Sequence, residues 1–142
     1  MKATDALLGE HGTFYLLFDH LERAAPGDCQ AGAALLAAAL IPHAQFENQR
    51  LFPALEERIG PDGPLAVMRA EHDEIEGTLL GLAALADPAE VRRRLRHAIA
   101  VAREHFRKEE MVLFPMAERA LGAAALERMG AEWSAARGVA AG

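Results

Sequence analysis

Two stretches of this chain carry the same pattern of residues, and this repeat restricts the fold more than any other feature. HAQFENQRLFPALEER (residues 43–58) aligns with HFRKEEMVLFPMAERA (residues 105–120) at an offset of 62 residues. A Glu-His pair precedes each stretch, at residues 10–11 and 71–72. Self-similarity at a fixed period is typical of folds built from one supersecondary unit used more than once. The repeat therefore predicts two helical hairpins packed about an approximate twofold axis.

Turn residues divide the chain into four long helical segments and one short one. Proline and glycine interrupt the helical periodicity near residues 26–28, 60–64 and 87–88. The expected helices run from Thr4 or Asp5 to about 24, from Asp28 to about 58, from Pro64 to about 86, from Asp87 to about 120 and from about 123 to 136. Thr4 or Asp5, Asp28 and Asp87 are the expected N-caps of the first, second and fourth helices, and Glu90 completes a capping box with Asp87.

Short turns make sequential helices antiparallel neighbours. The sequence thus predicts an all-α protein, an antiparallel up-down-up-down four-helix bundle with a short C-terminal fifth helix. We expect a single domain over residues 1–142, with the bundle at about 4–120, the last helix at about 123–136 and a frayed tail at 137–142.

Composition narrows the class of protein. The chain has 15 Lys and Arg against 21 Asp and Glu, a net charge of −6, which disfavours binding to nucleic acid. Its single cysteine, Cys29, excludes an internal disulfide and a cysteine-based zinc or iron–sulfur site. We find no apolar run of membrane-spanning length and no secretory signal, so the sequence predicts a cytoplasmic protein without a membrane partner.

The apolar stripes of the four long helices are interrupted at one level by ionisable residues. Steps of three and four residues place these side chains on the inward faces: His11, His43, Glu47, His72, His105 and Glu109. Beyond that level, the same steps place Ala54, Val112 and Met116 toward the core. Each poorly paired buried polar group costs on the order of 1–3 kcal/mol. Six of them would consume roughly the 5–15 kcal/mol that stabilises a whole domain.

A metal centre would compensate these groups, because it takes neutral imidazoles and ionised carboxylates together. His43 with Glu47, and His105 with Glu109, are each four residues apart and share a helix face. Each pair can give an imidazole to one metal and extend a carboxylate across to a second. The pattern predicts a dinuclear site with two bridging carboxylates, four terminal imidazoles and vacant coordination positions.

At these residues the chain resembles the hemerythrin-like family, the HHE cation-binding domain, over about residues 7–121. The markers are Glu-His twice, and His-x-x-x-Glu followed by Leu-Phe-Pro twice. The resemblance implies a non-heme di-iron centre, oxo- or hydroxo-bridged, inside a four-helix bundle. It implies uses in oxygen carriage, oxygen or redox sensing, nitric oxide or peroxide chemistry, and iron handling. The terminal ligands would be His11, His43, His72 and His105, and the bridging ligands Glu47 and Glu109.

One position departs from the oxygen-carrying members of that family, which have a second histidine one turn after the third-helix histidine. Here the residue is Glu76, so one iron would either keep an extra open or water-filled position or take Glu76 as an oxygen donor. Tyr15, one turn after His11, is the other candidate for the same space. An anionic oxygen ligand favours the ferric state, so it fits peroxide or redox chemistry better than reversible oxygen carriage. We expect a small ligand (O2, NO or peroxide) and a redox partner, and the sequence leaves open whether the protein is an enzyme.

Two other functions remain open at this point. Ferritin-like iron storage or ferroxidase sites use Glu-x-x-His spacing, whereas this chain has His-x-x-x-Glu, so they rank lower. A zinc-bound or metal-free helical interaction module is the third reading, because zinc accepts the same ligands. Among the remaining polar residues, Glu10 and Glu110 neighbour ligands in the sequence but point elsewhere on their helices, which leaves contacts to the ligand histidines open and disfavours metal binding. His20 is expected to face solvent or the rim of the bundle, and His97 is offset around its helix from His105.

Overall fold

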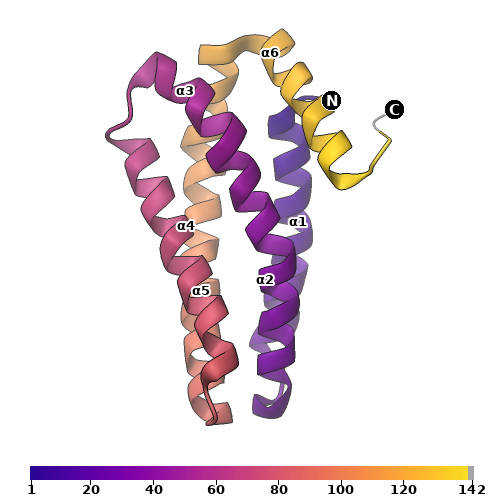
Figure 1. The fold of residues 1–142 in the computed structure, drawn as a ribbon, viewed down its shortest axis with the longest axis vertical. Helices are drawn as coiled ribbons and strands as arrows, with labels where there is room; N and C mark the ends of the chain where they lie inside the picture. Colours follow the sequence, from indigo (N-terminus) through magenta and orange to yellow (C-terminus); the bar gives the residue numbers. More distant parts are fainter. Residues whose placement is uncertain (141–142) are drawn as a thin grey trace.

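The computed structural model describes residues 1–140, and within them every regular element is a helix. The elements are α1 (Ala3–Glu22), α2 (Cys29–Phe46), α3 (Phe52–Ile59), α4 (Pro64–Gly81), α5 (Pro88–Lys108) and α6 (Phe114–Arg137). Figure 1 shows four long rods: α1, α2 continuing into α3, α4, and α5 continuing into α6. The all-α hemerythrin-like bundle predicted from the sequence is confirmed.

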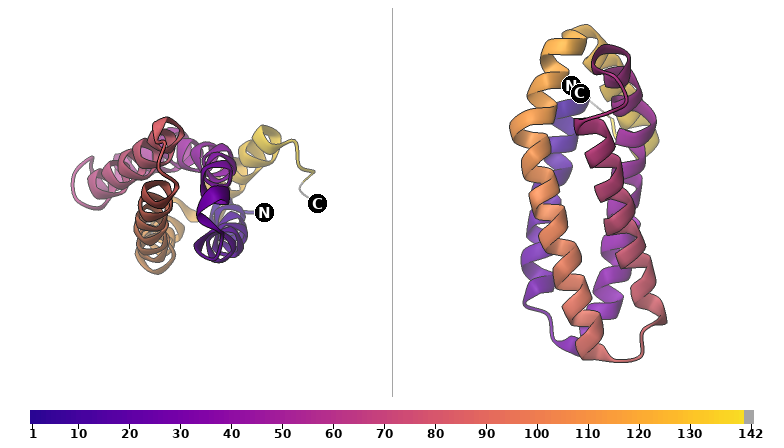
Figure 2. Two further views of the ribbon diagram at one scale, coloured as in Figure 1. Left: turned by 90° about the horizontal axis from the view of Figure 1, so that it is seen from below. Right: turned by 90° about the vertical axis from the view of Figure 1, so that its left-hand side faces the viewer.

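The two hairpins turn back at the same end of the bundle, as the right-hand view of Figure 2 shows. A 3-10 turn at Pro26–Asp28 joins α1 to α2, and another at Leu82–Ala84 leads from α4 toward α5. The side-chain amide of Gln30 donates to the carbonyl oxygens of Leu82 at 2.9 Å, Ala83 at 3.2 Å and Leu85 at 3.1 Å. This amide therefore ties the turn of the first hairpin to the turn of the second.

The buried apolar side chains form two clusters stacked along the bundle. One lies toward the hairpin turns and includes Phe14, Phe18 and Phe106. The other lies toward α3 and the bend of α6 and includes Phe52 and Phe114. The layer of histidines and glutamates lies between the two clusters, so apolar packing seals it from both ends.

Two of the rods contain one π-helical turn each: Glu47–Leu51 lies between α2 and α3, and Glu109–Leu113 lies between α5 and α6. The N–H of Phe52 bonds to the carbonyl of Glu47, and that of Phe114 to the carbonyl of Glu109, in both cases five residues back. A proline follows each phenylalanine. Because proline has no N–H and its ring clashes with the carbonyl four residues earlier, the α-helical ladder cannot continue unchanged there. The wider turn accommodates this, and such turns are frequent at functional sites.

The extra residue in each π turn shifts the inward face by one position. The sequence prediction that Ala54, Val112 and Met116 face the core was wrong, because a uniform helical period misses this insertion. Val112 is 52% exposed. The buried residues are instead the next ones along the chain: Leu55, Leu113 and Ala117.

The helix starts also differ from the expectation. Helix α1 begins at Ala3, so Thr4 lies inside it, and its hydroxyl donates to Glu118 at 2.5 Å instead of capping the helix. Asp28 makes no side-chain cap, because the 3-10 turn runs directly into α2. Asp87 does cap α5 by accepting from the N–H of Ala89 at 3.0 Å, as predicted.

Helix α6 bends sharply at Gly122, whose φ of 77° is open to glycine at little cost. Past this bend the helix crosses the end of the bundle and lies beside the start of α1, so both described ends of the chain are at this end (Figure 1). The expected short helix at about 123–136 corresponds to this arm, which is anchored by the fully buried Leu126. Residues 141–142 of the expected frayed tail lie outside the described residues.

The segment Pro26–Ile59 is long and apolar enough to cross a membrane by length and composition, unlike the expectation from the sequence. Its best window has a mean hydropathy of 1.2, and 44% of that window is buried in the bundle. A core helix of a soluble protein has the same properties, so this segment is weak evidence for a membrane span.

Gly130 tests how closely the arm of α6 packs on α1. A Cβ atom at Gly130 would collide with the backbone carbonyl oxygen of Met1, whereas one at Gly9 meets nothing within 4 Å. We expect Gly130→Ala to lower the free energy of unfolding by about 1–3 kcal/mol, as overpacking does. Gly9→Ala should instead raise it by roughly 0.5–1 kcal/mol, because alanine is the better helix former. Urea denaturation of both variants measures this, and an unchanged Gly130→Ala protein would contradict the close packing.

Candidate metal centre

The structure brings all six sequence-predicted ligand residues into one buried layer. His11 comes from α1, His43 from α2, His72 from α4 and His105 from α5, and the two glutamates open the π-helical turns. None of the six is more than 4% exposed, and Glu47 and Glu109 are fully buried. The helical periodicity and the His-x-x-x-Glu spacing thus bring these side chains together.

These residues form two groups that can each hold one metal ion, with all ligand atoms of a group within 4.8 Å of one another. The first group, which we call position A, is His11, His43, Glu47 and Glu109. The second, position B, is His72, His105, Glu47 and Glu109. Because both glutamates belong to both groups, the arrangement suits two neighbouring metals that share two carboxylates.

Each glutamate directs one oxygen toward each position. Glu47 Oε1 lies 3.3 Å from His43 Nε2, and its Oε2 lies 3.0 Å from His72 Nε2. Glu109 Oε2 lies 3.1 Å from His11 Nε2, and its Oε1 lies 2.7 Å from His105 Nε2. This division of oxygens is the geometry that a bridging carboxylate needs.

Six buried polar atoms in this layer have no hydrogen-bond partner: both carboxylate oxygens of Glu47 and of Glu109, His72 Nε2 and His105 Nε2. They lie close to one another but are not aligned as donors and acceptors, so their lone pairs converge without being satisfied. Unpaired buried polar groups require compensation. Two cations would supply it, and imidazole with carboxylate oxygen suits iron, zinc and other transition metals. The residues present therefore fit a dinuclear metal centre.

The Nδ1 atom of each of the four histidines, which points away from the metal positions, has a hydrogen-bond partner of its own. His43 Nδ1 lies 2.6 Å from Glu10 Oε2, and His105 Nδ1 lies 3.4 Å from Glu71 Oε1. Such partners fix the ring orientation and leave Nε2 free for a metal.

The other two partners cross between the hairpins: His11 Nδ1 lies 2.8 Å from Glu110 Oε1, and His72 Nδ1 lies 2.9 Å from Asn48 Oδ1. Glu10 and Glu110, for which the sequence left such contacts open, therefore do hydrogen-bond to ligand histidines. Sequence reasoning missed Asn48, although the repeat aligns it with Glu110 at the offset of 62.

Charges within the layer shift several pKa values. Burial lowers the pKa of His43, but the negative charge of Glu47 and the hydrogen bond to Glu10 outweigh it and raise that pKa to about 10. The pKa of His72 is shifted in the same way: burial opposes its charge, while the neighbouring carboxylates of Glu109 and Glu47 raise its pKa to about 9. Burial raises the pKa of Glu109, yet the facing imidazoles of His105, His11 and His72 hold that pKa well below its usual range. The carboxylates and these histidines therefore stabilise each other's charged forms.

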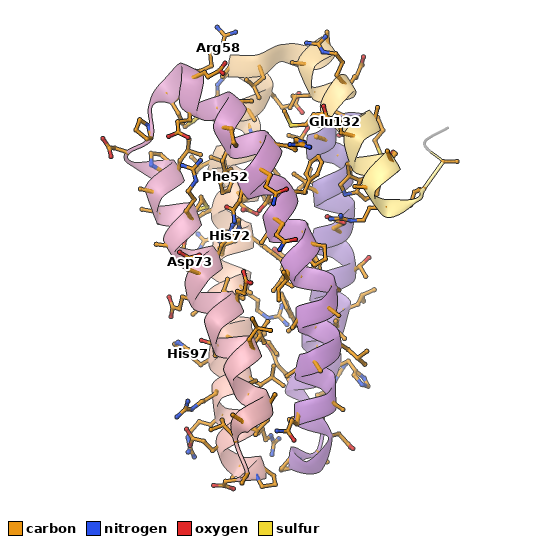
Figure 3. All side chains as sticks on the ribbon, in the orientation of Figure 1. Phe52, Arg58, His72, Asp73, His97 and Glu132 are labelled. Atoms are coloured by element: carbon orange, nitrogen blue, oxygen red, sulfur yellow. The ribbon has the colours of Figure 1, made fainter. Side chains whose placement is uncertain are left out.

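Aromatic rings pack against the histidines. Phe106 stacks on His11 with ring centroids 3.8 Å apart, and Phe52 stacks on His72 at 5.4 Å. Figure 3 shows Phe52 and His72 together between α4 and the rod of α2 and α3, while His97 points away from the bundle. His97 is exposed and lies 3.3 Å from Glu74. His20 is also exposed, as expected.

Tyr15 and Glu76, the two additional ligand candidates, lie outside both four-residue groups. The Tyr15 hydroxyl donates to Glu110 at 2.8 Å, and burial together with the charge of Glu110 raises the pKa of this phenol. Glu76 lines a cavity of about 20 Å³ beside His43, His72 and His105. The cavity is otherwise mostly apolar, and it has room for about one water-sized molecule. Whether either residue binds a metal stays a prediction.

A comparison with protein-family models matches the hemerythrin HHE cation-binding domain to residues 2–117 and again to residues 78–142. Neither the comparison with curated proteins nor that with solved structures found a match. Together with the buried histidine and glutamate groups, the family match supports a metal-binding function.

Tyr15→Phe separates a ligand from a supporting residue. Because the neutral hydroxyl donates to Glu110, we expect the variant to bind as much metal as the wild type and to keep its visible spectrum. Loss of one hydrogen bond should lower stability by about 1 kcal/mol. Absorption spectra of the iron-loaded proteins and their thermal unfolding measure both effects. Disappearance of a visible band in the variant would instead identify Tyr15 as a phenolate ligand.

Proposed function

Because the chain belongs to the hemerythrin HHE cation-binding family, we propose that it is a non-heme di-iron protein that binds or reacts with O2, NO or peroxide. The centre would be oxo- or hydroxo-bridged. His11 and His43 would hold one iron, His72 and His105 the other, and Glu47 and Glu109 would join the two. The role of the protein would be oxygen or redox sensing, or removal of peroxide.

The observation that carries this proposal is the division of the two carboxylates between the two histidine pairs. An oxygen of Glu47 lies within 3.3 Å of a histidine of each pair, and the same holds for Glu109. A site for a single metal would not need both carboxylates to face both ways. Four imidazoles and two shared carboxylates leave coordination positions for an exogenous ligand on six-coordinate metals.

The surrounding residues suit a small ligand. The cavity beside His72 and His105 is lined by apolar side chains such as Leu40, Ile75 and Leu79. Its volume of about 20 Å³ fits a diatomic molecule or a peroxide better than an organic substrate. When bound, two irons would supply the electrons that such a ligand accepts or shares. The apolar lining would exclude bulk water, which strengthens electrostatic interactions inside the site.

Zinc binding is a second candidate, and the size of the two groups favours it. Each group offers four nitrogen and oxygen ligands, the number that structural zinc sites use. The protein would then be a helical interaction module. Iron storage or ferroxidase activity is also compatible with a buried carboxylate pair, but the His-x-x-x-Glu spacing gives it less support.

The cellular setting remains part of the proposal. A net charge of −6 argues against a nucleic-acid partner, since a phosphate backbone repels an acidic surface. We propose a cytoplasmic protein that acts on a small ligand with a redox partner and without a membrane partner.

Metal content and the visible spectrum of the purified chain test the proposal. We expect two irons per chain and near-ultraviolet bands of an oxo-bridged pair that bleach with dithionite. Their return in air would indicate a binding or sensing role, and gas evolution with hydrogen peroxide would indicate an enzyme. Zinc or no metal after reconstitution with iron would contradict the di-iron proposal.

Glu47→Gln tests the shared carboxylate. Because Glu47 serves both positions, we expect the variant to lose affinity for both metals, by at least the roughly 10- to 100-fold that removal of an outer partner causes. Glu104→Gln, which neutralises an exposed glutamate on α5, is the control and should bind two metals normally. Loss of only one metal in Glu47→Gln would rule out a bridging role.

A further inference from the structure

The hydrogen bonds behind the four histidines differ between the two positions, and we infer from them that position A, at His11 and His43, binds its metal more tightly than position B, at His72 and His105. This inference rests on the proposed dinuclear metal site and adds which half of it is the stronger one. It concerns the partners of the ligands, not the ligands themselves, which are two imidazoles and two shared carboxylates at each position.

Both histidines of position A are held by short contacts to carboxylates. His43 Nδ1 lies 2.6 Å from Glu10 Oε2, and His11 Nδ1 lies 2.8 Å from Glu110 Oε1. Arg137 contacts only the other oxygen of Glu10, at 2.8 Å, and so leaves Oε2 to His43, whereas Lys108 contacts both oxygens of Glu71. A carboxylate that accepts the Nδ1 proton makes the imidazole a more basic ligand. Charge-assisted hydrogen bonds of this kind are also the stronger ones.

The histidines of position B have weaker partners. His72 Nδ1 meets the neutral amide oxygen of Asn48 at 2.9 Å. His105 Nδ1 is 3.4 Å from Glu71, and Lys108 Nζ lies 2.7 Å from each oxygen of that carboxylate. The ammonium group draws on the charge that Glu71 would otherwise direct to the imidazole. Both ligands at position B are therefore less basic than their counterparts at position A.

Packing differs in the same direction. The ring of His11 lies against Phe106 at 3.8 Å and near Phe114 at 5.5 Å, so it is held between aromatic side chains. His43, His72 and His105 line the small cavity, whereas His11 does not, and the stacking of Phe52 on His72 is looser, with ring centroids 5.4 Å apart. Rigid ligands lose less conformational freedom on binding a metal. The better-packed histidine thus adds to the advantage of position A.

The repeat supplies a matched pair of substitutions. Asn48 and Glu110 occupy equivalent places, each following a bridging glutamate and each contacting a histidine of the other hairpin. Asn48→Asp adds a carboxylate behind His72 at nearly unchanged volume, and Glu110→Gln removes one behind His11. The first variant strengthens position B and the second weakens position A.

Anaerobic titration of the full-length, metal-free chain with Co²⁺, followed by calorimetry and by visible absorption, resolves the two binding steps. Repulsion between two close cations makes the second metal bind more weakly than the first even at identical positions. Two different affinities alone therefore do not test the inference, and the variants are needed. We expect Asn48→Asp to tighten the weaker step by roughly 10- to 100-fold and leave the tighter one unchanged. Glu110→Gln should weaken the tighter step by a similar factor and spare the other.

Gln45→Glu is the control, because it adds the same charge on an exposed face of the same helix. It should leave both steps near their wild-type values. Equal effects of Asn48→Asp and Gln45→Glu, or action of both site variants on one step, would overturn the inference. Absence of any Co²⁺ binding by a folded wild-type chain would instead defeat the proposed metal site. Circular dichroism establishes that each variant is folded.

Discussion

The structure depends on two carboxylates, Glu47 and Glu109, that are fully buried and have no hydrogen-bond partner for any of their four oxygens. An isolated charge in such a place is very costly, so its compensation has to come from the same layer. The carboxylates act in this direction on two of the facing histidines, since the pKa of His43 is raised to about 10 and that of His72 to about 9, and positive charge on these imidazoles offsets the buried negative charge. A metal would take the place of the protons that carry this charge, because ligands bind it in their deprotonated form. Folding and metal binding are therefore linked through one polar layer.

A π-helical turn, present once in each half of the chain, places these carboxylates. In each inner rod, a glutamate begins a π-helical turn and Phe-Pro ends it. The proline cannot complete an α-helical turn, so the helix widens to a π-helical turn at the level where the glutamate enters the core. The same π-helical turn directs the phenylalanine inward, and Phe52 stacks on His72 as a result. Ligand position and the apolar cover of the ligand thus have one local cause.

The π-helical turn also explains how far the sequence could predict the site. Helical periodicity located the ligand layer, because the interval from His43 to Glu47, or from His105 to Glu109, precedes the extra residue of each π turn. It failed just beyond, where Leu113 is buried in place of Val112. The contact between Asn48 and His72 joins two helices, so it depends on their relative rotation, which no single-helix pattern contains. The contact between Lys108 and Glu71 was not predicted for the same reason, because it also joins two helices.

The repeat is conserved in its ligands and varied around them. Both halves supply His, then His-x-x-x-Glu, yet glutamate stands at 110 where asparagine stands at 48. Glutamate also stands at 76 where tyrosine occupies the equivalent place one turn after the histidine of the first half. The Tyr15 hydroxyl donates to Glu110, the partner of His11 at position A, while Glu76 lines the cavity beside His43, His72 and His105. Two identical ligand sets in different surroundings are suited to different tasks. If position A holds its metal more tightly, as inferred above, that metal would help to keep the bundle assembled while the coordination at position B changes.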